Sequence, residues 1–505
     1  MKKTIKIIGL LIAIVALNLG LITNVIAIST DANNYVTDTG TITVTGVDPG
    51  DSFSVYKILS TKYSANSISY EFSDSDKFET FIGQSSYSSI TPETWYDLYS
   101  SVEPGKITRP NVQNGTTLDQ VASAYAIYVK QNSATITGRP MTVNGTTATI
   151  SNLEAGSYLV LPTATTKVYA VMVGNIDFVV SNESWTKRDA TIVAKVESPS
   201  ITASFSNTVE TEHSHSYMLS DTINIYINYN LPNYPTNASN KTYSMSVDFS
   251  NGSYKDYDIS QLIFNKGKPQ EMTATIDRTT GVIKDANELT VGTYTIENSI
   301  ITFQASNIDD IMGSTVDAVI TAKFQDNVAI GVPQPINARL TYVTEPYGTG
   351  TANSDVELNA STYGLNLYLT EAGSDPVLGL VGAVYGIYDS TCTNEIASIT
   401  TADAGKATYR GIAAGTYCIK EKTVVSGYSL DTTEHTIIVG NNNYADATAS
   451  GYYKLDVTNS KAGALPLTGG IGTILYTMIG LLIIALAVLL ISTSKTRKEN
   501  KIETM

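Results

Sequence analysis

The chain has 505 residues, a length that allows about three domains of ordinary size. Its 42% apolar content supports several cores and excludes disorder as the main state. Only 16% of the residues are charged, yet the formal net charge is -15, an acidic bias opposite to that of nucleic-acid-binding proteins. Two cysteines exclude a disulfide-dense scaffold and most cysteine-rich metal modules, but they leave room for one bridge.

The N-terminal segment 1–27 predicts a secretory signal peptide. It begins with lysines, continues with an apolar run over residues 7–17, and ends with small-residue spacing at Val25 and Ala27. We expect cleavage after Ala27 and export of the remaining chain.

The C-terminal segment predicts a transmembrane helix over 470–491. Residues 471–491 carry no charge, and such a run is long enough to cross the ~30 Å hydrocarbon core of a membrane. Basic residues follow directly in the tail 492–505, which places that tail in the cytoplasm and the bulk of the chain outside.

A pentapeptide stands immediately before this span: Leu465, Pro466, Leu467, Thr468 and Gly469. With the apolar span and basic tail, it resembles the LPxTG cell-wall sorting signal of Gram-positive surface proteins. The alternative is a plain Pro/Gly linker beside the membrane. The resemblance implies that a sortase cysteine cleaves between Thr468 and Gly469. A membrane-anchored precursor would then yield a mature chain, 28–468, that a housekeeping sortase attaches to peptidoglycan.

The segment 28–196 predicts a β-rich N-terminal domain with a helical insertion. Alternating apolar residues begin at Thr41. Pro92 after a threonine predicts one helix start, and Thr117 with Gln120 forms a capping-box pattern before a second helix.

Two further β-rich domains are expected over 197–355 and 356–460, followed by a linker with the sorting motif over 461–469. Residues 223–229 alternate cleanly between apolar and polar, and the Gly-Thr repeat at 348–351 predicts the boundary between the two domains. Strands at short spacing without a βαβ rhythm predict an all-β fold of tandem Ig-like sandwiches.

Three segments of the third domain carry a family resemblance. Residues 380–385 resemble the LxGAxF strand of CnaB-type domains, 411–417 resemble their glycine turn, and 417–428 resemble the pilin E-box. In the second domain, Asp248 and Asn337 fall where such pilins have an acid and an asparagine. The exported region therefore resembles the SpaA-like isopeptide-domain pilins, the backbone subunits of sortase-assembled pili. Three E-box positions depart from the family pattern: Lys422, Val424 and Val425.

This resemblance implies polymerisation through Lys195. Lys195 lies in a short strand-plus-proline segment, 191–199, similar to the one that holds the linking lysine of such pilins. A pilin-type, class C sortase would join Thr468 of one copy to the Lys195 amine of the next. Because a lysine amine has a reference pKa near 10.4, the sortase pocket or Glu197 would have to help remove a proton. The alternative is a lysine that only protects a strand edge.

The resemblance also implies internal amide crosslinks, each of which needs a lysine, an asparagine and a protonated carboxyl group in one dry core. In the third domain Glu421 matches the acid and Asn459 the amide, but Leu369 occupies the lysine position. In the second domain Ala203 occupies it. We therefore expect neither crosslink from these residues and expect Glu421 and Asn459 to be hydrogen-bonded structural groups.

Cys392 and Cys418 both lie in the third domain, and we expect them to pair in the oxidising exterior. Closing the loop between them would stabilise the domain by about 3 kcal/mol on the chain-entropy model. The alternative is two free buried thiols.

No other pattern predicts catalysis or a cofactor. His213 and His215 would share a strand face, but without a third ligand a solvated loop is favoured over a metal site. No catalytic triad or phosphate loop is present in the expected context, so an enzyme is disfavoured.

Two functions remain. The leading one is a structural pilin that polymerises with other copies of itself and has a role in adhesion. The alternative is a monomeric, wall-anchored or ancillary adhesin that binds a host surface or matrix protein, in which Lys195 is inert.

Overall fold

Antiparallel strands dominate the computed structural model, which describes residues 28–100, 117–181, 184–234, 238–305, 308–463 and 472–499. The predicted signal peptide and sorting motif lie outside these residues. The chain groups into two compact units. The first reaches Ala360, and the second follows it and includes the short segments 216–219 and 329–332.

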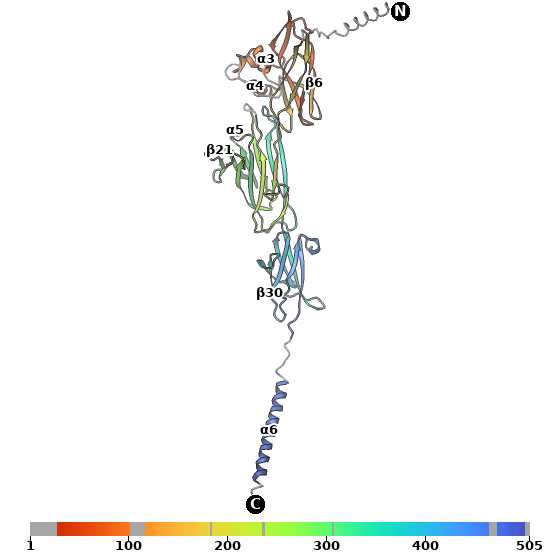
Figure 1. The fold of residues 1–505 in the computed structure, drawn as a ribbon, viewed down its shortest axis with the longest axis vertical. Helices are drawn as coiled ribbons and strands as arrows, with labels where there is room; N and C mark the ends of the chain where they lie inside the picture. The colour runs from red at the N-terminus through yellow and green to blue at the C-terminus, as the bar shows by residue number, and fades with distance from the viewer. Residues whose placement is uncertain are drawn as a thin grey trace, which may run out of the picture. The chain divides into compact units, whose positions relative to one another are not determined.

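The first sheets of unit one form a sandwich (Figure 1). One sheet has the order β11-β1-β6-β5, and the other has β10-β9-β7-β2-β3 with β4 beside β2. The apolar faces of both sheets meet in one core, in which Ile42 of β1 and Phe53 of β2 are almost completely buried. The strands are β1 Thr39–Thr45, β2 Ser52–Ser64, β3 Ser67–Phe72, β4 Arg139–Pro140, β5 Thr142–Asn144, β6 Thr147–Glu154, β7 Gly156–Ala164, β8 Val168–Tyr169, β9 Met172–Ser181, β10 Ser184–Arg188, β11 Ala190–Val193 and β12 Val196–Glu197.

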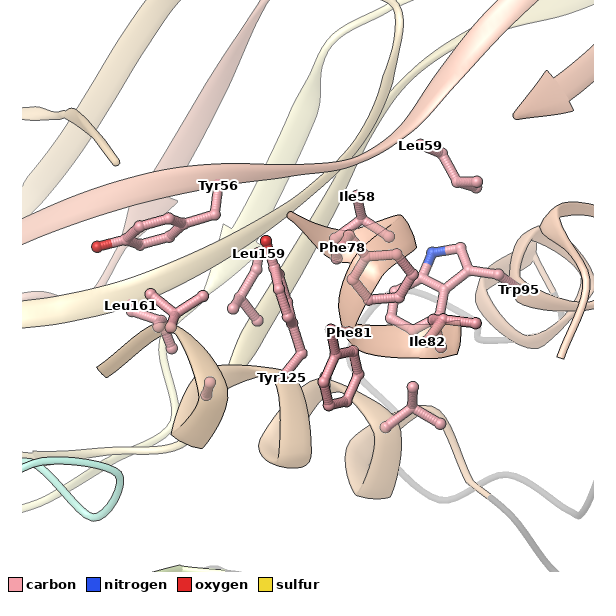
Figure 2. Close-up of a cluster of buried hydrophobic side chains, with 14 of the residues drawn as sticks. Tyr56, Ile58, Leu59, Phe78, Phe81, Ile82, Trp95, Tyr125, Leu159 and Leu161 are labelled. Atoms are coloured by element: carbon pink, nitrogen blue, oxygen red, sulfur yellow. The ribbon is translucent and has the colours of Figure 1, made fainter. Parts of the chain in front are cut away.

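Helices cover one face of this sandwich: α2 Phe78–Gln84, α3 Pro92–Ser100 and α4 Leu118–Gln131. Their aromatic residues pack on one another and on the sheet beneath (Figure 2). The Phe78 ring lies 5.2 Å from that of Trp95 and 4.7 Å from that of Tyr125, measured between centroids. The buried indole of Trp95 donates a hydrogen bond to Ser157 Oγ at 3.2 Å, which satisfies its only polar group.

The predicted capping box is confirmed at the start of α4. Thr117 Oγ1 accepts from the Gln120 amide at 3.3 Å, and Gln120 Oε1 accepts from the Thr117 amide at 2.8 Å. Helix α2 was not predicted, and its N-cap residue Lys77 has left-handed backbone without a side-chain cap.

The rest of unit one contains two more sheets, with orders β13-β15-β23-β17-β18 and β14-β25-β24-β16-β22-β21-β20-β19. The predicted alternation over 223–229 is confirmed by β15, whose isoleucines are buried. The elements are β13 Ile201–Ser204, β14 Ser214–Ser216, β15 Ile223–Asn230, β16 Tyr243–Asp248, β17 Tyr254–Phe264, β18 Met272–Thr273, β19 Thr275–Asp277, β20 Val282–Lys284, β21 Thr290–Glu297, β22 Ile300–Ala305, α5 Ile308–Ile311, β23 Thr315–Phe324, β24 Gln334–Val343 and β25 Thr351–Ser361.

The expected boundary at 355/356 is wrong. Residues 351–361 form β25, which pairs with β24 along its whole length, so the Gly-Thr repeat belongs to a hairpin rather than to a domain linker. At the other end, β12 pairs with β8 in a separate two-stranded sheet, so residue 197 is still joined to the N-terminal domain.

Unit two is a smaller sandwich of a β29-β26-β32 sheet and a β28-β27-β30-β31 sheet around one apolar core. Its elements are β26 Tyr363–Glu371, β27 Val384–Tyr388, β28 Glu395–Thr400, η1 Asp403–Gly405, β29 Lys406–Ile412, β30 Gly415–Thr423, β31 His435–Val439, η2 Asn442–Tyr444 and β32 Tyr452–Asn459. Helix α6, Gly472–Glu499, contains an unburied apolar stretch over 475–494 that is long enough to cross a membrane. The predicted span thus forms a helix that continues into the basic tail.

Candidate functional site

Lys195 lies in the short connection between β11 and β12, and its main chain is held on both sides. The Ala194 amide donates to Thr45 O at 2.8 Å, and Lys195 O accepts from the Ala170 amide at 3.2 Å. Strand β11 pairs with β1, and β12 pairs with β8. The Lys195 side chain itself is exposed. A fixed main chain thus presents an accessible amine.

The Lys195 side chain lines a cavity of about 660 Å³ in unit one. Two acids share this cavity, Asp119 on α4 and Glu197 on β12. The surrounding protein raises the pKa of both carboxyl groups, because burial disfavours the charged form. The other lining residues are Thr117, Gln120, Ser123, Val168, Ala170, Val171, Val196, Asn233, Tyr234 and Tyr347.

The cavity wall is fixed by side chains from distant parts of the sequence. Tyr347 follows β24, is only 3% exposed, and its hydroxyl lies 3.1 Å from Ser123 Oγ on α4. Nearby, Lys130 on α4 forms an ion pair with Glu345 at 2.8 Å. Sequence reasoning identified Lys195 and Glu197, but it missed Asp119 and Tyr347, because neither position stands out in a local pattern.

In unit two, the structure brings Glu421 and Asn459 together. Asn459 Nδ2 donates to Glu421 Oε1 at 2.8 Å, and Glu421 Oε2 accepts from the Asp431 amide at 2.7 Å. Both side chains are buried, at 7% and 2% exposure. Leu369 is fully buried in the adjoining core and pairs with Val457, two residues before Asn459. The acid and the amide are therefore hydrogen-bonded to each other beside an aliphatic side chain.

Two polar atoms in this region have no hydrogen-bond partner within the described part of the chain, Asn459 Oδ1 and the Tyr385 hydroxyl. Burial, followed by the charge of Glu421, raises the pKa of Tyr385 far above its usual value. This leaves the Tyr385 hydroxyl neutral.

In the second domain, the acid and the asparagine that resemble a crosslink site do not point into a core. Asp248 and Asn337 lie directly opposite each other on β16 and β24, but Asn337 is exposed and Asp248 only half-buried. Ala203 is buried on β13, at 1% exposure. Because Val247 and Ala338 take the inward positions of those strands, the acid and asparagine face outward. The assignment of Asp248 and Asn337 to a dry crosslink core is therefore not supported by their positions.

The expected disulfide is confirmed. Cys392 and Cys418 are bonded, with their Cα atoms 5.2 Å apart, and connect the loop before β28 to β30. Glu434 lies close enough to complete a three-ligand group with them, but both thiols are consumed by the bond. His215 contacts Glu212 at 2.6 Å, and His213 is exposed. The ligand group found among the described residues, Cys392, Cys418 and Glu434, includes neither histidine.

Comparison with protein families identifies two matching segments. Residues 367–452 match the SpaA prealbumin-like fold domain, and residues 457–501 match the LPXTG cell wall anchor motif. The second match spans the expected sorting pentapeptide and extends into α6. The motif and the apolar helix make the chain a cell-wall-attached surface protein with a membrane-anchored precursor.

Comparison with individual proteins points the same way. The chain is 26% identical over 266 residues to the trypsin-resistant surface T6 protein of Streptococcus pyogenes serotype M6, a match that covers 49% of this chain and 47% of the relative. The chain therefore spans about half the length of this curated relative.

Solved structures share the fold over a larger region. The T6 backbone pilin of serotype M6 Streptococcus pyogenes, which has a modular three-domain structure, superposes with a TM-score of 0.61 and 18% identity, over 86% of this chain and 100% of that one. The major pilin SpaD from Corynebacterium diphtheriae gives a TM-score of 0.51 and 12% identity, over 87% and 100% of the two chains. The expected all-β, tandem-domain fold is confirmed.

Proposed function

We propose that this cell-wall protein is a structural backbone pilin, whose copies are joined by an amide bond from Thr468 of one chain to Lys195 of the next. A pilin-type, class C sortase would form these bonds, and a housekeeping sortase would attach the finished polymer to peptidoglycan. The likeness in fold to the T6 backbone pilin and to SpaD supports this role.

The observation that carries the proposal is the setting of Lys195. Its main chain is hydrogen-bonded on both sides, while its amine is exposed and faces a cavity. A lysine that acts as an acyl acceptor needs this combination, because the amine must reach an incoming thioester without loss of orientation. A lysine that merely protects a strand edge would need no adjoining cavity.

The chain would act as the substrate of these reactions and not as their enzyme. Its own contribution is a nucleophile, Lys195, and an acyl donor, Thr468, while the cysteine that carries the intermediate belongs to the sortase.

The proposal predicts that Lys195→Ala abolishes covalent polymers. The full chain would be produced in a Gram-positive host with a pilin-type sortase, and boiled wall extracts would be separated by electrophoresis. Wild type should give a ladder of covalent multimers, and Lys195→Ala should give only the monomer, since the acceptor amine is gone. Lys187→Ala is the matched control, because Lys187 lies in the same sandwich on β10, outside the cavity.

An undiminished ladder from Lys195→Ala would show that another lysine forms the link between subunits. If wild type itself gives only monomers in a host whose sortase polymerises its own pilin, the chain is instead a wall-anchored monomer, and the adhesin function becomes the better account.

A further inference from the structure

Asp119 and Lys195 line the same cavity, although the two residues are far apart in sequence. Asp119 stands in the first turn of α4, and both side chains line the same cavity. Asp119 reaches solvent there. Within the described residues it forms no ion pair, so its carboxylate is available to the amine.

The position of Asp119 is fixed by the rest of α4. The capping box at Thr117 and Gln120 holds the first turn, and the helix buries one face in the aromatic core (Figure 2). Ser123, one turn after Asp119, contacts the buried Tyr347 hydroxyl. The position of a carboxylate on such a rigid turn is fixed, while the long lysine side chain can change its rotamer.

The electrostatics favour Asp119 over Glu197 as the partner of the amine. Burial raises the pKa of Asp119, and the positive charge of Lys195 lowers it. For Glu197, burial alone raises the pKa, although this residue is only two positions from Lys195. Of the two acids that line the cavity, only Asp119 has its pKa lowered by the charge of Lys195.

An acid in a first helical turn also has a purely structural role, since it stabilises the positive end of the helix dipole. Glu93 holds the equivalent place in α3 and does not line the cavity. The two residues share the structural role, so a comparison between them isolates any effect on Lys195.

We propose that Asp119 is a positioning residue for the linking lysine, holding the Lys195 amine at the cavity and accepting its proton. This inference rests on the proposed function. The Lys195 ammonium gives one proton to the Asp119 carboxylate, and the neutral amine attacks the Thr468 thioester carbonyl. The carbon–sulfur bond breaks, the sortase thiolate takes the second proton of the attacking nitrogen, and Asp119 returns its proton to solvent.

The test is the rate of polymer growth in cells, measured by pulse-chase on the full chain with a pilin-type sortase that polymerises wild type. Asp119→Asn should slow conversion of monomer to ladder by about a hundredfold or more, the usual loss when a positioned proton acceptor is removed. Asp119→Glu should restore most of the rate, because it keeps the carboxylate. Glu93→Gln should polymerise like wild type.

The outcomes separate the two proposals. If Lys195→Ala leaves the ladder intact, both the linkage and the role of Asp119 are wrong. If Lys195→Ala abolishes it while Asp119→Asn polymerises at the wild-type rate, only the role of Asp119 is wrong. If Asp119→Glu is as slow as Asp119→Asn while protease resistance of the monomers is unchanged, the carboxylate is not what matters, which also contradicts the proposal.

Discussion

At the scale of single residues, the third domain holds two of the three groups that an internal amide crosslink requires. Glu421 and Asn459 are buried and hydrogen-bonded, and Asn459 Oδ1 has no partner within the described region. Leu369 faces the same core on the adjacent parallel strand. An acid and an amide are thus in place, and only the amine is missing.

Leu369→Lys should therefore install the crosslink. The new amine would attack the Asn459 side-chain carbonyl, and Glu421 would transfer protons as ammonia leaves. We expect the intact mass of the purified variant to fall one ammonia below the calculated value. The double variant Leu369→Lys, Asn459→Ala should show its full calculated mass, because it lacks the amide. A folded, protease-resistant single variant with full mass would contradict this account of the site.

At the scale of elements, the loop around η2 covers the outer face of β26 through one buried acid. Asp446 accepts hydrogen bonds from Asn366 Nδ2 at 2.7 Å, from the Tyr368 hydroxyl at 3.2 Å and from the Thr448 amide at 2.9 Å. Burial raises the pKa of Asp446, but hydrogen bonds from Thr448, Asn366 and Tyr368 outweigh it and lower the pKa to about 2.

This lowered pKa predicts an acid-sensitive contribution to stability. The Asp446 carboxylate stabilises the fold above its unfolded pKa of about 3.9, and the contribution disappears as the pH falls through the folded pKa of about 2. Asp446→Asn should lower the unfolding temperature of unit two at pH 7. Between pH 4 and 2, this temperature should fall less for the variant than for wild type, as followed by calorimetry. Asp403→Asn, at an exposed position in η1, should leave the curve unchanged. If the unfolding temperatures of wild type and Asp446→Asn fall equally between pH 4 and 2, the stabilising role of the Asp446 carboxylate is contradicted.

The elements predicted best are those with a strong local signal. β15 alternates over its whole length, and α4 begins with a capping box. Helix α2 has no side-chain cap, so the sequence contains no capping pattern from which its start could be predicted. The Gly-Thr repeat before β25 wrongly predicted a domain boundary, because a hairpin and a domain linker use the same small residues. Only the pairing of β25 with β24 distinguishes the two.

At the scale of the whole molecule, the proposed bond joins two distant parts of the chain. Lys195 belongs to unit one, and Thr468 comes between β32 and α6 in the sequence of unit two. Motifs in the sequence identified both, because each sits in a short continuous segment. The cavity around Lys195 could not be predicted, because its wall combines α4, β12 and Tyr347 from separate regions of the sequence. Composition left room for one disulfide, and the structure contains the Cys392–Cys418 bond.

The central claim is the bond between Thr468 and Lys195, and peptide mass spectrometry of purified polymer tests it most directly. Trypsin should cleave after the exposed Lys461 and leave segment 462–468 attached to its acceptor. We predict a branched peptide in which the Thr468 carboxyl carbon is joined to Lys195 Nζ, with this lysine resistant to cleavage. The same segment attached to a different lysine, with Lys195 unmodified, would contradict the account.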